Sequence, residues 1–152
     1  VVPMSKSFRY QLYAFAIYLY VVIYSGAFVR HTETSLACPS WPFCSSQLWF
    51  PALNTPAGIH FLHRILVLVI FIWLLYLTVR AIRYFKEEKV ILWAFVLAFL
   101  FVVLQTLSGA AIVFSRLNLF VSLAHGFFIS CLFVIICYLL LLASRHTLLE
   151  KN

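Results

Sequence analysis

The chain has 152 residues, of which 65% are hydrophobic and only 10% are charged. Soluble domains average roughly 45–50% apolar and about 25% charged residues, so this composition excludes a water-soluble globular domain. A domain of this length has no core large enough to shield so many Phe, Leu, Ile and Val side chains from water. We therefore expect the solvent around most of the chain to be lipid.

Four apolar segments are each long enough to cross a bilayer, which takes about 20 residues of α-helix. They are residues 10–29, 59–79, 90–114 and 119–144, separated by a long loop (30–58), a charged turn (80–89) and a short turn around 116–118. The segments show no strand-like alternation, and a lipid-exposed backbone must satisfy its own hydrogen bonds. The sequence therefore predicts an all-α, multi-pass cell-membrane protein, with residues 1–152 forming a single four-helix transmembrane domain.

Lysine and arginine residues are distributed unequally between the two ends of these segments. Three of them, Arg30, Arg64 and Arg116, lie on one side and eight lie on the other. Cytoplasmic loops carry the excess of Lys and Arg, so we expect both termini in the cytoplasm and an extracytoplasmic loop over residues 30–58. This orientation explains the positive charge without a nucleic-acid partner. The eight are Lys6, Arg9, Arg80, Arg83, Lys86, Lys89, Arg145 and Lys151.

The N-terminal sequence does not look like a cleaved signal peptide. Residues 10–29 make a full-length span that lacks a small-residue cleavage site. The chain begins Val1-Val2-Pro3 and not with methionine, which we interpret as a sign of a fragment of a longer protein. An unrelated start at Met4 is the alternative.

The first and third segments share a motif of small residues. Ser25-Gly26-Ala27 lies near the outer end of the first segment and Ser108-Gly109-Ala110 near the outer end of the third. Small residues let a helix approach a neighbour or a flat ligand closely. We therefore predict two repeated helical hairpins, with Gly26 and Gly109 lining a ligand pocket. Ordinary packing between membrane helices is the alternative for either motif alone.

The second and fourth segments each carry a histidine near the outer end. At 1.5 Å per residue, His63 lies about 6 Å below the start of its segment and His125 about 9 Å below. Both segments run inward, so these side chains can face each other across the bundle, and an ionisable group in a membrane is a functional-site candidate. We predict a haem with one imidazole on each face, suited to electron transfer or structure rather than to oxygen binding.

Other interpretations of the histidine pair stay open. Hydrogen-bonded structural histidines, another metal and a proton relay are the alternatives. Zinc or copper takes three or four ligands, and the second and fourth segments offer no nearby membrane carboxylate. His60, one turn before His63, is a further candidate for the same pocket or for a ligand.

Three arginines at the outer face are candidate partners for haem propionates. Arg64 follows one predicted ligand directly, and Arg30 and Arg116 lie at the same membrane face. A guanidinium group matches a carboxylate with two parallel hydrogen bonds. For each arginine the alternative is an interfacial side chain that extends to the membrane surface.

Cys38 and Cys44 lie in the extracytoplasmic loop, within the sequence Cys-Pro-Ser-Trp-Pro-Phe-Cys. That side of the membrane permits disulfides, so we predict a bond between them. A redox-active or metal-binding pair is the alternative. The apolar residues 48–51 of the same loop predict a lid that lies along the outer interface, over the haem edge.

In combination, these motifs resemble haem A synthase, most of all the C-terminal half of the enzyme from Bacillus-type bacteria. The resemblance covers nearly the whole chain, about residues 10–145, with the motifs in the same order. They are Gly26-Ala27-Phe28-Val29-Arg30-His31-Thr32-Glu33, Cys38-Pro39-x-x-Pro42-x-Cys44, His63-Arg64, Leu107-Ser108-Gly109 and Ala124-His125.

The resemblance implies an eight-helix enzyme built from two similar halves, which oxidises a methyl group of haem O to the formyl group of haem A for terminal oxidases. In the family's N-terminal half, a Glu three residues before the first ligand histidine is implied to be catalytic. Here that position is His60, and all four acidic residues lie outside the predicted spans. They are Glu33, Glu87, Glu88 and Glu150.

This departure makes the chain the expected haem b half, with no catalytic residue of its own. The resemblance implies that His63 and His125 are the axial ligands of haem b and that Cys38–Cys44 is the outer-loop disulfide. The expected partners are the N-terminal catalytic half or an equivalent subunit and the lipid bilayer, with haem O synthase as a further candidate.

Three other functions compete with this one. The first is a stand-alone membrane b-type cytochrome that passes electrons to or from quinone. The second is a half-size synthase that acts as a homodimer, against which the missing Glu argues. The third is a structural assembly subunit without haem.

Overall fold

The structure, a computed structural model, describes residues 4–151, with side chains described up to residue 145. This part of the chain forms four α-helices and no strand: α1 (Lys6–His31), α2 (Pro56–Tyr84), α3 (Lys89–Phe114) and α4 (Leu119–Lys151). All four are long and apolar enough to cross a membrane, which confirms the all-helical, multi-pass architecture. Residues 1–3, on which the interpretation as a fragment rests, and the Lys151 side chain lie outside the described residues.

Polar side chains determine where three of the helices begin. Ser5 Oγ accepts a hydrogen bond of 3.2 Å from a first-turn N–H of α1, and Thr55 Oγ1 accepts one of 3.1 Å from α2. Asn118 Oδ1 accepts two, of 3.0 and 3.2 Å, from the first turn of α4. These caps satisfy N–H groups that have no partner within the helix. Each predicted span lies within one of the four helices.

The turn between α2 and α3 is shorter than the charge pattern predicts. The pattern places a turn over residues 80–89, whereas α2 continues to Tyr84 and α3 begins at Lys89. The Arg80 guanidinium lies 5.4, 5.9 and 5.5 Å from the ring centroids of three aromatic residues, Phe8, Tyr76 and Tyr84. Cation–π contacts of this kind stabilise a charged side chain on the surface of a helix. The charge at Arg80 is therefore accommodated within α2 and does not end the helix.

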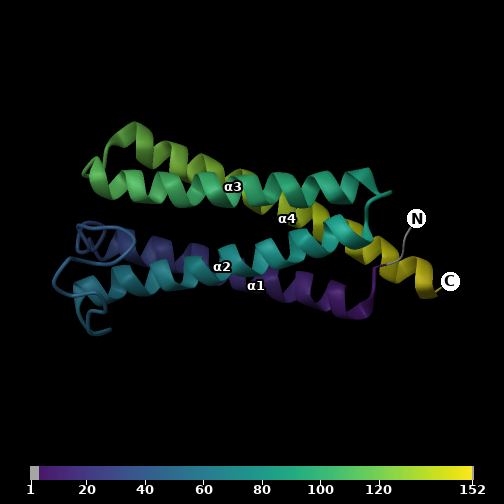
Figure 1. The fold of residues 1–152 in the computed structure, drawn as a ribbon, viewed down its shortest axis with the longest axis horizontal. Helices are drawn as coiled ribbons and strands as arrows, with labels where there is room; N and C mark the ends of the chain where they lie inside the picture. Colours follow the sequence, from purple (N-terminus) through teal and green to yellow (C-terminus); the bar gives the residue numbers. More distant parts are fainter. Residues whose placement is uncertain (1–3, 152) are drawn as a thin grey trace.

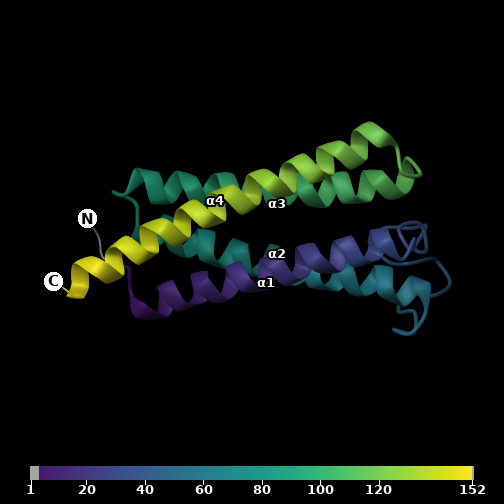
Figure 2. The ribbon, with the colours of Figure 1, turned by 180° about the vertical axis from the view of Figure 1, so that it is seen from behind.

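The helices form a bundle in which α2 and α4 lie diagonally opposite each other, since contacts join α1 to α2, α2 to α3, α3 to α4 and α4 to α1. Both termini lie at one end of the bundle, which we call the terminal end (Figure 1). The α1–α2 loop and the α3–α4 turn lie at the other, the loop end. Seen from behind, α4 runs obliquely from α3 at the loop end towards α1 at the terminal end (Figure 2).

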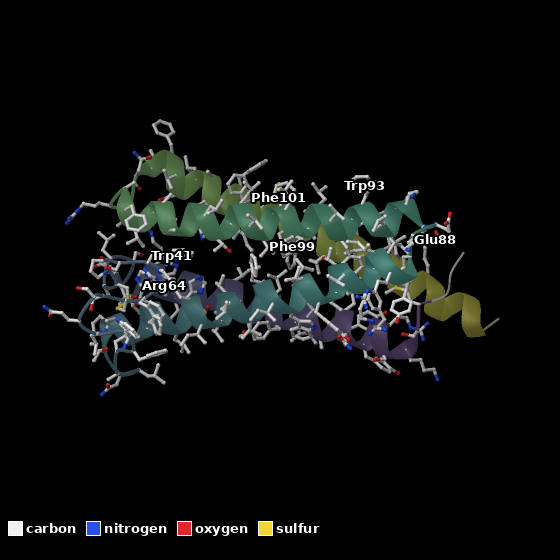
Figure 3. All side chains as sticks on the ribbon, in the orientation of Figure 1. Trp41, Arg64, Glu88, Trp93, Phe99 and Phe101 are labelled. Carbon is white, nitrogen blue, oxygen red and sulfur yellow. A yellow bond between two sulfur atoms is a disulfide. The ribbon has the colours of Figure 1, made fainter. Side chains whose placement is uncertain are left out.

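A continuous apolar core joins all four helices. Towards the loop end its buried members stop at one residue on each helix, and both predicted ligand histidines lie beyond this layer. In the middle of the bundle Phe99 of α3 lies on the side facing α2 (Figure 3), with its ring centroid 5.2 Å from that of Phe71. The four residues that end the core are Val22, Ile70, Val102 and Leu132.

The loop between α1 and α2 folds back onto the start of α2. Its disulfide between Cys38 and Cys44 is buried and forms a small second cluster with Phe61. Phe50 meets Phe61 edge to face at 5.3 Å, yet 67% of its surface is exposed. Trp41 lies at this end and Trp93 towards the other (Figure 3). Exposed aromatic side chains near both ends match the interfacial belts of membrane proteins.

Candidate functional site

His63 of α2 is tied to α1 through one ring nitrogen. It lies seven residues after Pro56, about 10 Å into the helix. Its Nδ1 is 2.6 Å from Oγ of Ser25 on α1, and the same Oγ is 2.6 Å from the carbonyl oxygen of Val22. The half-buried imidazole therefore has a defined orientation relative to α1.

His125 of α4 repeats this arrangement in the second hairpin. It lies six residues after Leu119, about 9 Å into the helix. Its Nδ1 is 2.9 Å from Oγ of Ser108 on α3, and that Oγ is 3.0 Å from the carbonyl oxygen of Gln105. In both hairpins, a serine of the first helix therefore contacts Nδ1 of a histidine on the second.

A glycine follows each of these serines and lies against the same imidazole. A Cβ atom at Gly26 would be 3.0 Å from Cε1 of His63 and 3.4 Å from its Nε2. A Cβ atom at Gly109 would be 3.2 Å from Cε1 of His125. A side chain at either position would push the imidazole out of its present place. The two glycines therefore make room for the rings of His63 and His125.

The two histidines lie at corresponding places on diagonally opposite helices. Their depths of about 10 and 9 Å below the helix starts differ by less than one helical turn. Both histidines are partly buried and lie beyond the end of the apolar core, towards the loop end.

Gln105 of α3 adds a polar group next to one histidine only. Its side-chain Nε2 is 3.2 Å from Nε2 of His125, while its Oε1 is buried without a hydrogen-bond partner in the described part of the chain. The corresponding position of α1, three residues before the serine, is Val22. Both histidines contact a serine hydroxyl, but only His125 also contacts a side-chain amide.

Arg64 contacts the cysteine loop. Its Nη1 donates to the carbonyl oxygen of Ser40 at 2.6 Å, and its Nη2 donates to that of Cys38 at 3.1 Å. Nη1 also lies 3.3 Å from the carbonyl oxygens of Pro42 and Phe43. The guanidinium group thus binds carbonyls of the ring that the disulfide closes. Arg64 and Trp41 of that ring lie together at the loop end (Figure 3).

His60 is buried and also binds the loop. Its Nδ1 lies 2.9 Å from the carbonyl oxygen of Thr34, which accepts the hydrogen bond. This hydrogen bond therefore links the first turns of α2 to the start of the α1–α2 loop. Of the remaining predicted site residues, Arg30 at the end of α1 and Arg116 in the α3–α4 turn are exposed at the loop end.

These residues fit a haem held between two imidazoles. The serine contacts engage Nδ1 of both histidines, so that Nε2 would be the nitrogen for iron, and the glycines make room for both rings. At His125 the side chain of Gln105, whose Nε2 is 3.2 Å from Nε2 of the imidazole, would have to move aside. Within the described residues, no group of three or more His, Cys, Asp or Glu side chains is placed to hold a metal ion, as a zinc site would require.

Comparison with known proteins places the chain in a family. Residues 1–137 match the family model described as cytochrome oxidase assembly protein. The chain belongs to this family. A relative from Geobacillus thermodenitrificans named "Heme A synthase" is 47% identical over 142 residues, which cover 93% of this chain and 44% of the relative.

Further members of the family with the same name show the same coverage. The protein of Bacillus mycoides strain KBAB4 is 38% identical over 149 residues, and that of Bacillus cereus strain 03BB102 is 39% identical over 149 residues. Each alignment covers 98% of this chain and 48% of the relative. The chain thus spans about half the length of the curated relatives it matches.

Sequence reasoning missed the hydrogen bonds that tie the histidines to Ser25 and Ser108. The signal that could have found them is the serine that precedes the glycine in both small-residue motifs. It also missed the contacts of His60 and Arg64 with the loop. No sequence pattern marks these, because the acceptors are backbone carbonyls.

Proposed function

We propose that this chain is the haem b-binding segment of a haem A synthase, with His63 and His125 as the two axial ligands. The observation that carries the proposal is the repeated arrangement of histidine, serine and glycine on two pairs of helices. Family membership and the relatives named "Heme A synthase" support the same function. For the full-length enzyme the proposed reaction is oxidation of the haem O methyl group to a formyl group.

Two histidine ligands would suit a haem that transfers electrons. A haem held by His63 and His125 would supply a reversible one-electron couple, and with both histidines bound it would leave no free position for oxygen. Ser25 and Ser108 would orient the imidazoles, while Gly26 and Gly109 would let α1 and α3 approach them. The apolar core ending at Val22 would separate the site from the terminal end of the bundle.

The oxidation chemistry itself is proposed to take place in the part of the relatives that this chain does not cover. Catalysis on a haem methyl group needs a group that can manage protons near the haem edge. None of the acidic residues whose side chains the structure describes belongs to a membrane-spanning helix: Glu33 follows α1, and Glu87 and Glu88 form part of the α2–α3 turn. His60, which stands three residues before His63, is occupied by its bond to Thr34.

The proposal is tested by expressing the chain in membranes, alone and together with the complementary half of the Geobacillus thermodenitrificans relative. Extracted haems are then separated and identified. We expect haem b in the chain alone, and haem A only when both halves are present. If the chain holds haem b but yields no haem A with its partner, and is reduced by a quinol, the stand-alone cytochrome is correct. A chain without haem in both cases would overturn the proposal in favour of a structural subunit.

A further inference from the structure

Each serine hydroxyl at the site lies between a backbone carbonyl oxygen and Nδ1 of a histidine. Because the hydroxyl has one proton, it can donate to only one of the two. Ser25 Oγ is 2.6 Å from the carbonyl oxygen of Val22 and 2.6 Å from Nδ1 of His63. A hydroxyl has a single proton to donate but can accept further hydrogen bonds. A carbonyl oxygen can only accept. The proton of Ser25 must therefore point to Val22, and the bond to His63 requires a proton on Nδ1.

The same count applies in the second hairpin. Ser108 Oγ is 3.0 Å from the carbonyl oxygen of Gln105 and 2.9 Å from Nδ1 of His125. If Ser108 donated to the imidazole instead, two oxygen atoms would face each other without a proton between them. Such a contact is unfavourable in a low-dielectric interior. Both imidazoles are thereby driven to carry their proton on Nδ1.

We propose that Ser25 and Ser108 are positioning residues that select the Nδ1–H tautomer of His63 and His125 and so present an unprotonated Nε2 to iron. The inference rests on the proposed haem function and deepens it. A neutral histidine binds a metal only through its unprotonated nitrogen, and the hydrogen bond of the other nitrogen selects which one this is.

The adjacent glycines, Gly26 and Gly109, also restrict the orientation of the two imidazole rings. Cε1 lies between the two ring nitrogens, and this atom is the one nearest to Gly26 in His63 and to Gly109 in His125. Consecutive residues of one helix therefore fix the same edge of the ring, the serine through Nδ1 and the glycine through Cε1. This edge-on contact limits rotation of the imidazole about its bond to Cβ.

The serines should also tune the iron. An acceptor on Nδ1–H makes the imidazole a stronger electron donor to the metal, which favours the oxidised state. A neutral hydroxyl is a weaker acceptor than a carboxylate, so its effect is moderate. Loss of either hydroxyl should raise the reduction potential, and loss of both should raise it further. Removal of a group that orients a metal ligand typically weakens metal binding by about 10–100-fold.

The test uses the purified full chain with Ser25→Ala, Ser108→Ala and the double variant. Ser25→Thr and Ser108→Thr keep a hydroxyl and should restore the wild-type behaviour. Ser130→Ala is the matched control, because Ser130 is exposed on α4 and bonds the carbonyl oxygen of Gly126 at 2.8 Å. We expect weaker haem binding and a higher midpoint potential in both alanine variants, with Ser130→Ala unchanged. A midpoint potential that is unchanged when both serines are replaced by alanine would overturn the proposal that these serines position the histidines and lower the potential of the haem.

A second measurement separates failure of this inference from failure of the haem proposal. Nitrogen-15 spectra of histidine-labelled, haem-free wild-type protein report the tautomer of each imidazole directly. We expect His63 and His125 to carry the proton on Nδ1 in the wild type and to lose this preference in the alanine variants. A proton on Nε2 in the wild type would overturn the inference even if haem binds. Protein that binds no haem but shows Nδ1–H at both histidines would support tautomer selection and reject the cofactor.

Discussion

Gly26 lies so close to His63 that a Cβ atom at this position would be 3.0 Å from Cε1 of the imidazole. This distance is shorter than ordinary van der Waals contact, so any side chain here must displace the ring or the helix. The relationship between Gly109 and His125 is similar, at 3.2 Å. The backbones of α1 and α3 therefore limit the positions of the two imidazole rings on α2 and α4.

Enlarging these glycines should disturb the haem ligands in proportion to the size of the new side chain. We expect Gly26→Ala to reduce haem retention modestly, because the ring must move by only a few tenths of an ångström. Gly109→Leu should abolish retention or change the spectrum strongly, since its side chain would occupy the place of the His125 ring. Haem content and the visible spectrum of purified protein check both. Unchanged spectra in both variants would show that the glycines face something other than the ligands.

Gly58 provides a test of the loop that is independent of the haem ligands. A Cβ atom at Gly58 would overlap the carbonyl oxygen of Ala52 and lie 2.7 Å from Cα of Leu53. Both are backbone atoms, so the loop must shift, and overpacking of this kind costs about 1–3 kcal/mol. We expect Gly58→Ala to lower the thermal stability of the purified protein. Gly126→Ala is the control, because a Cβ atom there meets nothing within 4 Å. Equal stability of the two variants would contradict the packing of the loop on α2.

Arg64 should act mainly on the loop. Its hydrogen bonds to Ser40 and Cys38 carry a full positive charge, and such bonds contribute about 1.5–3 kcal/mol each. We expect Arg64→Gln to open the loop, seen as faster hydrogen exchange over residues 38–44. Arg30→Gln, an exposed change at the same end, should leave exchange unaffected. A loss of haem without any change in loop exchange would instead favour pairing of Arg64 with a propionate.

The state of the four cysteines can be counted by mass. Cys38 and Cys44 form a disulfide, whereas Cys131 and Cys137 of α4 are free. We expect an alkylating reagent to add two groups per chain in denatured, unreduced protein, and four after reduction. Denaturation removes burial as an explanation for missing labels. Four additions without reduction would show that the loop cysteines are not bonded.

The sequence was sufficient to predict the four helices, whereas the roles predicted for the site residues stay predictions. Hydrophobic segments of membrane length predicted all four helices, because lipid leaves the backbone few alternatives. His63 and His125 stood out because ionisable residues are rare within such segments. The Ser-Gly motifs predicted that Gly26 and Gly109 line a ligand pocket, which stays a prediction, and the structure places both glycines against imidazoles.

The contacts of the outer loop were beyond sequence reasoning. Arg64 was interpreted as a partner of haem propionates, and that prediction stays untested, but its partners in the structure are carbonyls of residues 38–43. Every residue offers a carbonyl oxygen, so no pattern marks the four that converge on one guanidinium. The bond from His60 to Thr34 depends in the same way on the path of the loop.

The central claim is that His63 and His125 hold one haem, and a visible spectrum tests it most directly. Spectra of the detergent-purified chain, oxidised and then reduced with dithionite, are compared with those of His63→Ala, His125→Ala and the control Gly126→Ala. The account predicts a sharp low-spin b-type spectrum in the wild type and the control, lost in either histidine variant. A colourless wild-type protein prepared with haem available, or a spectrum that survives both substitutions, would contradict it.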